Sequence, residues 1–447
     1  MRSIVFFLIG LSIPILTHAQ VRVKPSPSKG FEERISTYIN NMTIVDTHEH
    51  LLSPSDFKER TTLDFMVLLQ HYSALDLQSA GSPPIYKIRD DGSMSIQDKW
   101  EILKPSWEGS KNTAYNRASL LAADKLFEVD DINETTIELL SERINKAYQN
   151  ENWINYVVEE KCKIDFLIQD MEDRSFGTDG FRYVKRLDDF VHLHTKEHIQ
   201  WIAESQNMTV ETLDDLVQAL EKAFEKANEK GIVGIKTALA YDRILHFRDE
   251  SREDAEKVFS KLMNSPGEYY YAFNEVRPLQ DFMMHRLMDL ARDHKLPVQV
   301  HTGLHINKNH IENSNPIHLT NLFFEYPDVK FILFHGSYPY GGELSAVAKN
   351  FPNVYIDMCW LYVISPSYSE RYLHEWLETV PASKIMAFGG DYLNIENTFA
   401  HLLFAKQVVT NVLVDKVKSG YFSEAEAKEI AQMILHDNAV KILKLSK

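Results

Sequence analysis

Residues 43–50 read Thr-Ile-Val-Asp-Thr-His-Glu-His, a short apolar strand with two histidines at its carboxyl end. Side chains two residues apart in a strand point to the same side, so His48 and His50 would direct two imidazoles towards one point. Two imidazoles at one point suit a divalent metal ion. A His-x-His pair often occurs by chance, so the rest of the chain must show whether further ligand-type residues reach the same place.

Seven more segments of the chain are short apolar runs separated by stretches of helical character. They lie at 165–168, 181–190, 231–236, 296–301, 329–335, 354–357 and 385–391. Buried strands that alternate with helices imply a parallel sheet covered on both faces. With the first strand the count is eight, which predicts a closed (β/α)8 TIM barrel. An open doubly wound sheet is the alternative, but no glycine-rich dinucleotide loop follows the first strand.

The polar ends of the later strands extend the pattern of the first. His301, His335 and Asp391 each stand at the carboxyl end of a predicted strand. In a TIM barrel these ends converge on one pocket. We therefore expect the three residues to lie near His48 and His50 and to form a metal-dependent active site with them.

Residues 52–160 interrupt the rhythm and predict a long, mostly helical insertion after the first strand, within a barrel that spans 41–447. The insertion leaves the barrel at the rim of the expected pocket, where lids and substrate-binding loops belong. Trp100, Trp107 and Tyr115 could cover a substrate there, or form the core of the insertion itself. Before the barrel, residues 20–40 are expected to form a polar linker and an N-terminal helix.

The first nineteen residues predict a secretory signal peptide, with Arg2 before an apolar stretch and cleavage after Ala19. The stretch is shorter than the roughly 18 apolar residues that a spanning helix needs, so we expect no membrane anchor. The mature protein is expected to be exported, either periplasmic or secreted. Export would permit a disulfide between Cys162 and Cys359, but their apolar surroundings favour buried free thiols.

The charge balance excludes some partners. The chain has 48 Lys and Arg residues against 64 Asp and Glu residues, a formal charge of −16. Nucleic acids and anionic membranes are bound through basic clusters, so neither is expected as a partner. A small-molecule substrate fits the expected pocket, and a homo-oligomer is left open.

At six segments the sequence resembles the amidohydrolase superfamily, and more narrowly the amidohydrolase-related group that also contains aromatic-acid decarboxylases. The matching segments are 45–51, 234–236, 300–303, 334–336, 388–392 and 436–439. The resemblance implies one divalent cation held by His48, His50, His301 and Asp391, with Zn²⁺ favoured and Mn²⁺ as the alternative. It also implies that Asp391 accepts the proton of a metal-bound water, while His335 stabilises developing charge.

The resemblance leaves the role of Lys236 open. Some superfamily members carry a carboxylated lysine on the fourth strand that bridges two metals, but we favour one metal here. Lys236 would then bind a substrate carboxylate or pair with an acidic neighbour. Tyr241 and Arg243 follow on the next loop, and Arg243 is expected either to clamp a carboxylate or to lie on the surface.

Several other polar residues receive structural interpretations. Arg186 and Asp188 share one face of the third strand, and a structural ion pair is expected there unless they reach the pocket. His192, His194 and His198 lie close together without a clear fourth ligand, and we expect them to face solvent.

The leading functional hypothesis is an exported metal-dependent hydrolase that cleaves a C–N or C–O bond of an amide, lactone or ester. The alternative keeps the same site but runs non-hydrolytic chemistry, as an aromatic-acid decarboxylase or a sugar-acid isomerase. A third hypothesis, a binding protein on an inactive barrel, is disfavoured because none of the expected ligands is missing.

Overall fold

The computed structural model describes residues 28–58, 63–170, 179–306 and 309–446. The predicted signal peptide and most of the linker lie outside this part of the chain. Eight strands form one sheet in sequence order, and every pair of neighbouring strands is parallel. The strands are β1 (Ile44–Glu49), β2 (Ile164–Gln169), β3 (Phe181–Arg186), β4 (Gly234–Thr237), β5 (Val298–Val300), β6 (Phe331–Leu333), β7 (Val354–Asp357) and β8 (Ile385–Met386).

Backbone hydrogen bonds join the first strand to the chain that leaves the last one and close the barrel. Thr47 N donates to Phe388 O at 3.1 Å, and Asp391 N donates to His48 O at 2.9 Å. Every residue of β1 is buried, as expected for a strand covered on both faces. The predicted (β/α)8 barrel is therefore confirmed.

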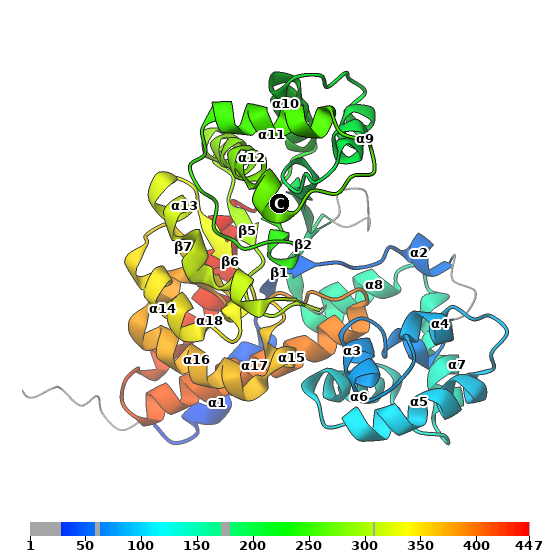
Figure 1. Cartoon of the computed structure of the whole chain (residues 1–447). Helices are drawn as coiled ribbons and strands as arrows, with labels where there is room; N and C mark the ends of the chain where they lie inside the picture. The colour runs from blue at the N-terminus through cyan, green and yellow to red at the C-terminus, as the bar shows by residue number, and fades with distance from the viewer. Residues whose placement is uncertain (1–27, 59–62, 171–178, 307–308, 447) are drawn as a thin grey trace, which may run out of the picture.

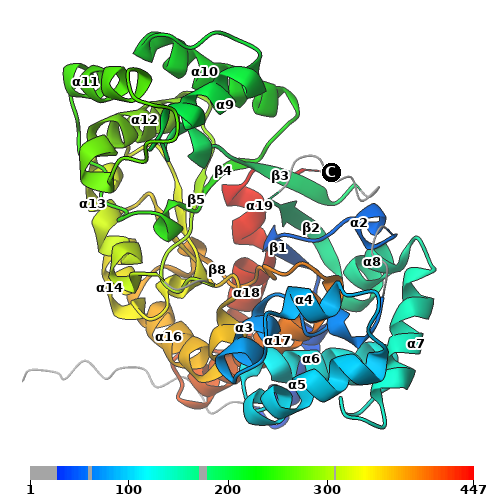
Figure 2. The same cartoon turned by 45° about the vertical axis from the view of Figure 1, so that its right-hand side comes forward.

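Helices surround the barrel on its outer side (Figures 1 and 2). The main ones are α9 (Lys196–Gln206), α10 (Leu213–Glu229), α11 (Arg252–Met263), α12 (Phe273–Asp293), α13 (Thr320–Glu325), α14 (Gly341–Asn350), α15 (Leu361–Ile364), α16 (Pro366–Thr379), α17 (Ile395–Lys418), α18 (Glu424–Gln432) and α19 (Asn438–Ile442). In α10 the buried residues recur at helical spacing, and Thr212 and Asp215 form a capping box at its start. Helix α1 (Phe31–Asn41) matches the predicted N-terminal helix.

The segment between β1 and β2 is helical, and it packs beside α17, more than 200 residues away in sequence (Figures 1 and 2). Its helices are α2 (Pro54–Lys58), α3 (Tyr72–Ser79), α4 (Ile85–Arg89), α5 (Ile96–Ser110), α6 (Ala114–Phe127), α7 (Ile137–Tyr148) and α8 (Trp153–Tyr156). Trp153 Nε1 and the Tyr148 hydroxyl donate to the buried carboxylate of Glu396 on α17, at 2.7 and 3.1 Å. Trp100 and Trp107 are 1% exposed, so both belong to the packed core.

The later strands are shorter than the sequence predicted, most clearly the third and the last. The third strand ends at Arg186, because Asp188–Phe190 turns into a short 3-10 helix. The last strand has two residues instead of seven, since the chain after Met386 bonds to β1 and leaves regular geometry.

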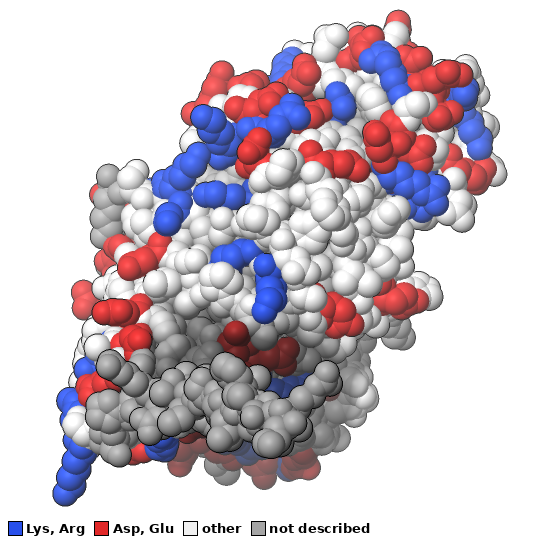
Figure 3. Space-filling model, turned by 90° about the vertical axis from the view of Figure 1, so that its left-hand side faces the viewer, with Lys and Arg blue, Asp and Glu red and all other residues white. Residues whose placement is uncertain are grey.

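Among the described residues, no helix has the length and apolarity needed to cross a membrane. Cys162 and Cys359 are both buried and free, as predicted. On the face drawn in Figure 3, basic and acidic side chains alternate over the upper part, and much of the middle is uncharged. The acidic excess of the chain is thus spread among basic residues on this face rather than gathered in one patch.

Candidate metal centre

The carboxyl ends of β1 and β8 bring three predicted ligands together. His48 Nε2 and His50 Nε2 lie 3.2 Å apart. Asp391 Oδ1 lies 3.7 Å from His48 Nε2 and 3.1 Å from His50 Nε2. Burial raises the pKa of Asp391, but the hydrogen bond and charge of His50 outweigh it and hold this pKa well below its usual range. Asp391 therefore presents a carboxylate to the two imidazoles.

Asp170 joins this group, although the sequence analysis did not name it. It follows directly after β2, and its Oδ2 lies 3.9 Å from His48 Nε2 and 3.8 Å from His50 Nδ1. One ligand atom from each of His48, His50 and Asp170 falls within 4.8 Å of the others. The sequence did hold a signal for this residue, because Asp170 is a carboxylate just after a predicted strand. The prediction ended that strand at Ile168, two residues before Asp170, and so did not place it at a strand end.

His301 and His335 form a second pair of imidazoles, from the ends of β5 and β6. His301 Nε2 lies 2.8 Å from Leu304 O, and His335 Nδ1 lies 3.0 Å from Cys359 O. Carbonyl oxygens only accept, so these two contacts use the single N–H that each neutral imidazole carries. His301 Nδ1 and His335 Nε2 face each other at 2.9 Å. Each of these two nitrogens is then unprotonated and carries a lone pair.

The protonation states of His301 and His335 show whether a cation fits between the two rings. Burial lowers the pKa of His335 to about 4 and that of His301 well below its usual value, so both rings are neutral at pH 7. Two lone pairs that face each other in a buried site repel unless a cation lies between them. The donor set of imidazole and carboxylate groups suits a divalent ion of the zinc or manganese type. The residues present thus fit a divalent metal.

Backbone strain marks the ends of three successive strands. His335, Trp360 and Asp391 have φ of 62°, 64° and 61°, in the left-handed region that side chains other than glycine rarely adopt. Such conformations cost roughly 1–3 kcal/mol each and persist only where the surroundings impose them. Here two of the three residues belong to the candidate centre, and the third touches it, since the rings of Trp360 and His335 lie 5.0 Å apart.

A cavity of about 490 Å³ opens above the candidate ligands. Its lining includes His50, His301 and Asp391, together with Lys236 and Tyr241. The Lys236 ammonium lies 3.7 Å from the centre of the Phe334 ring, and burial lowers its pKa to about 8. The predicted substrate-binding residues Lys236 and Tyr241 therefore stand in the same cavity as the predicted ligands.

Two arginines exchange the roles that the sequence suggested. Arg186, expected to form a structural pair, lines the cavity and pairs with Asp170 while its side chain stays 43% exposed. Arg243, offered as a carboxylate clamp, is buried against Asp281 and donates to Gln280 Oε1 at 3.0 Å. Its donors are taken up by the protein, and it lies neither on the surface nor in the lining of the cavity.

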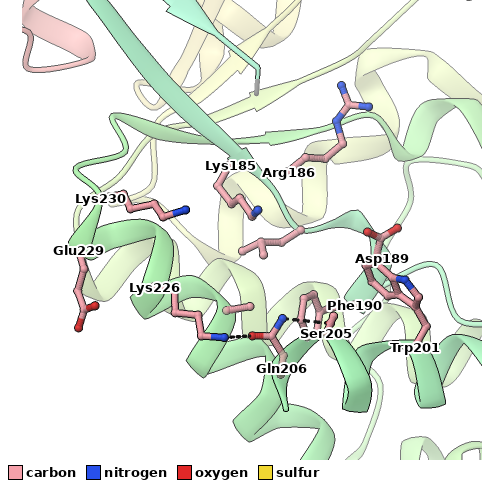
Figure 4. Close-up of a pocket in the computed structure, with 12 residues that line it drawn as sticks. Lys185, Arg186, Asp189, Phe190, Trp201, Ser205, Gln206, Lys226, Glu229 and Lys230 are labelled. Atoms are coloured by element: carbon pink, nitrogen blue, oxygen red, sulfur yellow. Dashed lines mark hydrogen bonds between the residues drawn. The ribbon is translucent and has the colours of Figure 1, made fainter. Parts of the chain in front are cut away.

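A second cavity lies on the outer side of β3, between that strand and helices α9 and α10 (Figure 4). Lys185 points into it, whereas Arg186 points the opposite way. This alternation is normal in a strand, and it explains why Arg186 reaches the candidate site while its neighbour does not. Arg186 and Asp189 contribute to the lining of both cavities.

The helical insertion contributes two residues that the sequence analysis missed. His71 and Tyr72 line the cavity, and a side-chain hydrogen bond joins Tyr72 to Asp391. The Tyr72 ring stacks on Trp360 at 4.4 Å, and Tyr115 stacks on Tyr72 at 5.3 Å. Tyr115 thus packs behind the site, 9% exposed, rather than covering it. No spacing rule placed these residues, because they reach the barrel only through tertiary packing.

One further expectation was wrong. His194 does not face solvent, because it is 4% exposed and its Nδ1 lies 2.7 Å from Tyr271 O. Its Nε2 lies 3.0 Å from Gln280 Nε2, so both ring nitrogens are occupied. His194 is therefore a satisfied core histidine that helps to hold Gln280 and, through it, Arg243.

A closed parallel barrel with imidazole and carboxylate groups at its strand ends defines the class of metal-dependent TIM-barrel enzymes. The family model described as amidohydrolase matches residues 212–445, which is more than half of the chain. The protein therefore belongs to the amidohydrolase family, as the sequence motifs indicated.

Similar proteins fall into two groups. Protein fluG of Emericella nidulans is 29% identical over 227 residues, or 49% of this chain, and the match spans only 26% of that protein. Uronate isomerase of Thermotoga neapolitana is 22% identical over 90% of this chain and 95% of its own length. The crystal structure of uronate isomerase from Thermotoga maritima has a TM-score of 0.77 at 18% identity, covering 93% of this chain and 98% of that one.

Proposed function

We propose that the protein is a metal-dependent isomerase of a uronic acid or a closely related sugar acid. The observation that supports this is the extent of the similarity to uronate isomerase, which runs through 90% of the chain and 95% of the relative. A match of that length takes in the insertion as well as the barrel. The insertion is the part that supplies His71 and Tyr72 to the cavity.

The reaction moves one hydrogen between adjacent carbons while an aldehyde becomes a hydroxyl and the neighbouring hydroxyl becomes a ketone. His48, His50 and Asp391 would hold the divalent metal, with Asp170 close to both imidazoles and His301 on the wall of the same cavity. When bound, the ion would act as a Lewis acid on the substrate oxygens.

Charged groups around the cavity suit a substrate with a carboxylate. Arg186 offers a partly exposed guanidinium, whose planar fork matches a carboxylate in two parallel hydrogen bonds. Lys236 adds a second cation on the wall of the same cavity. With its pKa lowered to about 8, Lys236 remains mostly charged at pH 7 and can pair with an anion.

Proton transfer needs groups that can hold a proton near the substrate. Tyr72 is hydrogen-bonded to Asp391, and burial raises the pKa of its hydroxyl, so it stays protonated as a donor. Burial lowers the pKa of His71 to about 3, which leaves a neutral imidazole. Its buried Nδ1 has no hydrogen-bond partner among the described residues, but with a pKa of about 3 it does not hold a proton at pH 7, which leaves Tyr72 as the proton donor from the insertion.

The hydrolysis of an amide, lactone or ester, which was the leading hypothesis from sequence, would use the same donor set. The full-length similarity to isomerases now favours the alternative. We keep Zn²⁺ as the proposed metal and Mn²⁺ as its competitor. We also propose that the enzyme is exported, which N-terminal sequencing of the mature protein would test, with Gln20 as the expected first residue.

The experiment is to incubate the metal-loaded protein with D-glucuronate in D₂O and to follow the sugar by NMR. Isomerisation predicts formation of the ketose and metal-dependent exchange of one carbon-bound hydrogen. The His48→Ala, His50→Ala double variant is the control and should show neither. If glucuronate and related sugar acids stay unchanged while a lactone or amide is cleaved, the isomerase proposal is wrong and the hydrolase hypothesis returns.

A further inference from the structure

The two oxygens of Asp391 face different groups of ligand-type atoms. Oδ1 approaches His48 and His50, whereas Oδ2 lies 3.9 Å from His335 Nδ1. On the Oδ2 side, Asp391, His335 and Cys359 form a buried group whose ligand atoms all lie within 4.8 Å of one another. Cys359 has no part in the function proposed above.

Cys359 is held tightly at the carboxyl end of β7. Its N–H donates to Asp357 Oδ1 at 2.9 Å, and its carbonyl accepts from His335 Nδ1 at 3.0 Å. The thiol packs against Gly389, where a Cβ atom would come within 2.9 Å of the cysteine sulfur. The N–H is thus fixed to the end of its own strand β7 and the carbonyl to His335 after β6, and the side chain is fully buried.

The charges around this sulfur come from the interior of the barrel. Asp391, Asp357 and Lys236 are the groups that act on it most strongly, apart from burial itself. Burial raises the pKa of the thiol well above its usual value, so without a metal Cys359 carries its proton. A bound divalent cation reverses this preference, because a coordinating thiol is deprotonated outright.

We propose that Cys359 supplies a thiolate ligand to the metal centre, on the Oδ2 side of Asp391. On binding, the S–H bond breaks, the proton leaves to solvent, and the sulfur donates an electron pair to the cation. The donors on this side would be the sulfur of Cys359 and the carboxylate of Asp391, because His335 Nδ1 carries the N–H that Cys359 O accepts. A soft thiolate favours Zn²⁺ over Mn²⁺. The inference concerns metal identity, so it stands apart from the choice of substrate.

The chain offers its own control in Cys162. This residue is also fully buried, but it ends the π-helical turn Val157–Cys162 before β2 and belongs to neither group of candidate ligands among the described residues. Cys162→Ser therefore removes a buried thiol without touching the centre. Any effect shared by both cysteine variants would reflect packing alone.

The test is to load the wild-type protein, Cys162→Ser and Cys359→Ser with Co²⁺ and to record their absorption spectra. A thiolate ligand adds a near-ultraviolet charge-transfer band to the weak visible bands of the ion. We expect this band in wild type and Cys162→Ser and its loss in Cys359→Ser, with the visible bands retained. Zn²⁺ affinity should fall about tenfold or more in Cys359→Ser, while Mn²⁺ affinity changes little.

A second measurement needs no variant at the site, in case Cys359→Ser fails to fold. X-ray absorption of the Zn²⁺-loaded Cys162→Ser protein should show a sulfur neighbour at about 2.3 Å. Absence of that neighbour, or a charge-transfer band that survives in Cys359→Ser, would overturn the inference. Neither readout depends on turnover, so a failure of the isomerase proposal would leave this result unaffected.

Discussion

The strand ends of the barrel and the helical insertion both contribute residues to the candidate site, but different interactions position them. His48, His50 and Asp391 are placed by strand geometry, so their positions follow from local sequence and from the closure of the sheet. Tyr72 and Tyr115 arrive on helices that pack sideways onto the barrel, stacked on Trp360. The barrel thus supplies the candidate metal ligands and most of the cavity wall, and the insertion adds His71 and Tyr72 to that wall.

This difference suggests that the barrel and the insertion have separate roles in the candidate site. Changes at strand ends should alter metal binding and the reaction itself. Changes in the insertion should alter geometry and substrate fit while the metal stays bound.

The largest effect is expected from the His48→Ala, His50→Ala double variant. Removing two imidazoles should empty the centre and lower turnover by roughly 10³-fold or more, because metal polarisation contributes several kcal/mol to the barrier. Elemental analysis should find about one metal ion per wild-type chain and none in the variant. Two ions per wild-type chain would instead favour a bridging, carboxylated Lys236, and an unchanged metal content would place the centre elsewhere.

The next prediction concerns Arg186 and Arg243, whose replacement should affect substrate binding and stability respectively. Arg186→Met should raise KM about 10- to 100-fold, because a charge-assisted hydrogen bond to the substrate is worth roughly 1.5–3 kcal/mol. It should cost less stability than Arg243→Met, because Arg186 is 43% exposed and Asp170 keeps His48 and His50 as neighbours. Arg243→Met should instead destabilise the fold by about 3 kcal/mol, since it leaves the fully buried Asp281 short of a partner.

Steady-state kinetics and thermal unfolding of the two variants check this separation. A normal KM in Arg186→Met would remove that residue from the substrate site. A raised KM in a fully folded Arg243→Met would restore the clamp that the sequence suggested.

A smaller effect is expected in the insertion. Tyr115→Ala removes a ring from the stack and should lower kcat about tenfold while metal content stays normal. Tyr115→Phe should restore most of the activity, because the ring carries the stacking, which is worth roughly 0.5–1.5 kcal/mol. Loss of metal in Tyr115→Ala would contradict the division between barrel and insertion.

The last effect concerns pH and a carboxyl on the wall of the cavity, and it acts on stability rather than on turnover. Burial raises the pKa of Asp188 from 3.8 to about 6. Between these values the folded state binds more protons than the unfolded state, so stability falls as pH rises from about 4 to 6. The cost at pH 7 is at most about 3 kcal/mol.

Thermal unfolding of Asp188→Asn against pH tests this linkage. The variant should be more stable than wild type at pH 7 and should lose that advantage near pH 4. An advantage that is the same at both pH values would show that ionisation of Asp188 is not its cause.

The sequence predicted the barrel well because buried parallel strands leave a strong local signal. It also placed His335 and Asp391 after the sixth and eighth strands, but Asp391 stands beyond β8 (Ile385–Met386) rather than at its last residue. It missed Asp170 because two residues of a strand end were not recognised. It missed His71 and Tyr72 for a deeper reason, since no periodicity within residues 52–160 reveals which face of a helix will meet a strand end. The sequence also could not show that Arg243 is buried, because its partner Asp281 lies on α12 and meets it only in the folded protein.

The left-handed backbone at His335, Trp360 and Asp391 has a consequence for the history of such sequences. Glycine would adopt the conformations of His335 and Asp391 without the steric penalty, so these two side chains are retained against a gain in backbone stability. The buried Trp360 ring offsets its own strain by packing. In a descendant that no longer needed the reaction, selection would no longer oppose replacement of His335 and Asp391 by glycine. Side chains that persist at these positions in a related protein would therefore indicate continuing selection for activity, and glycines there would indicate its loss.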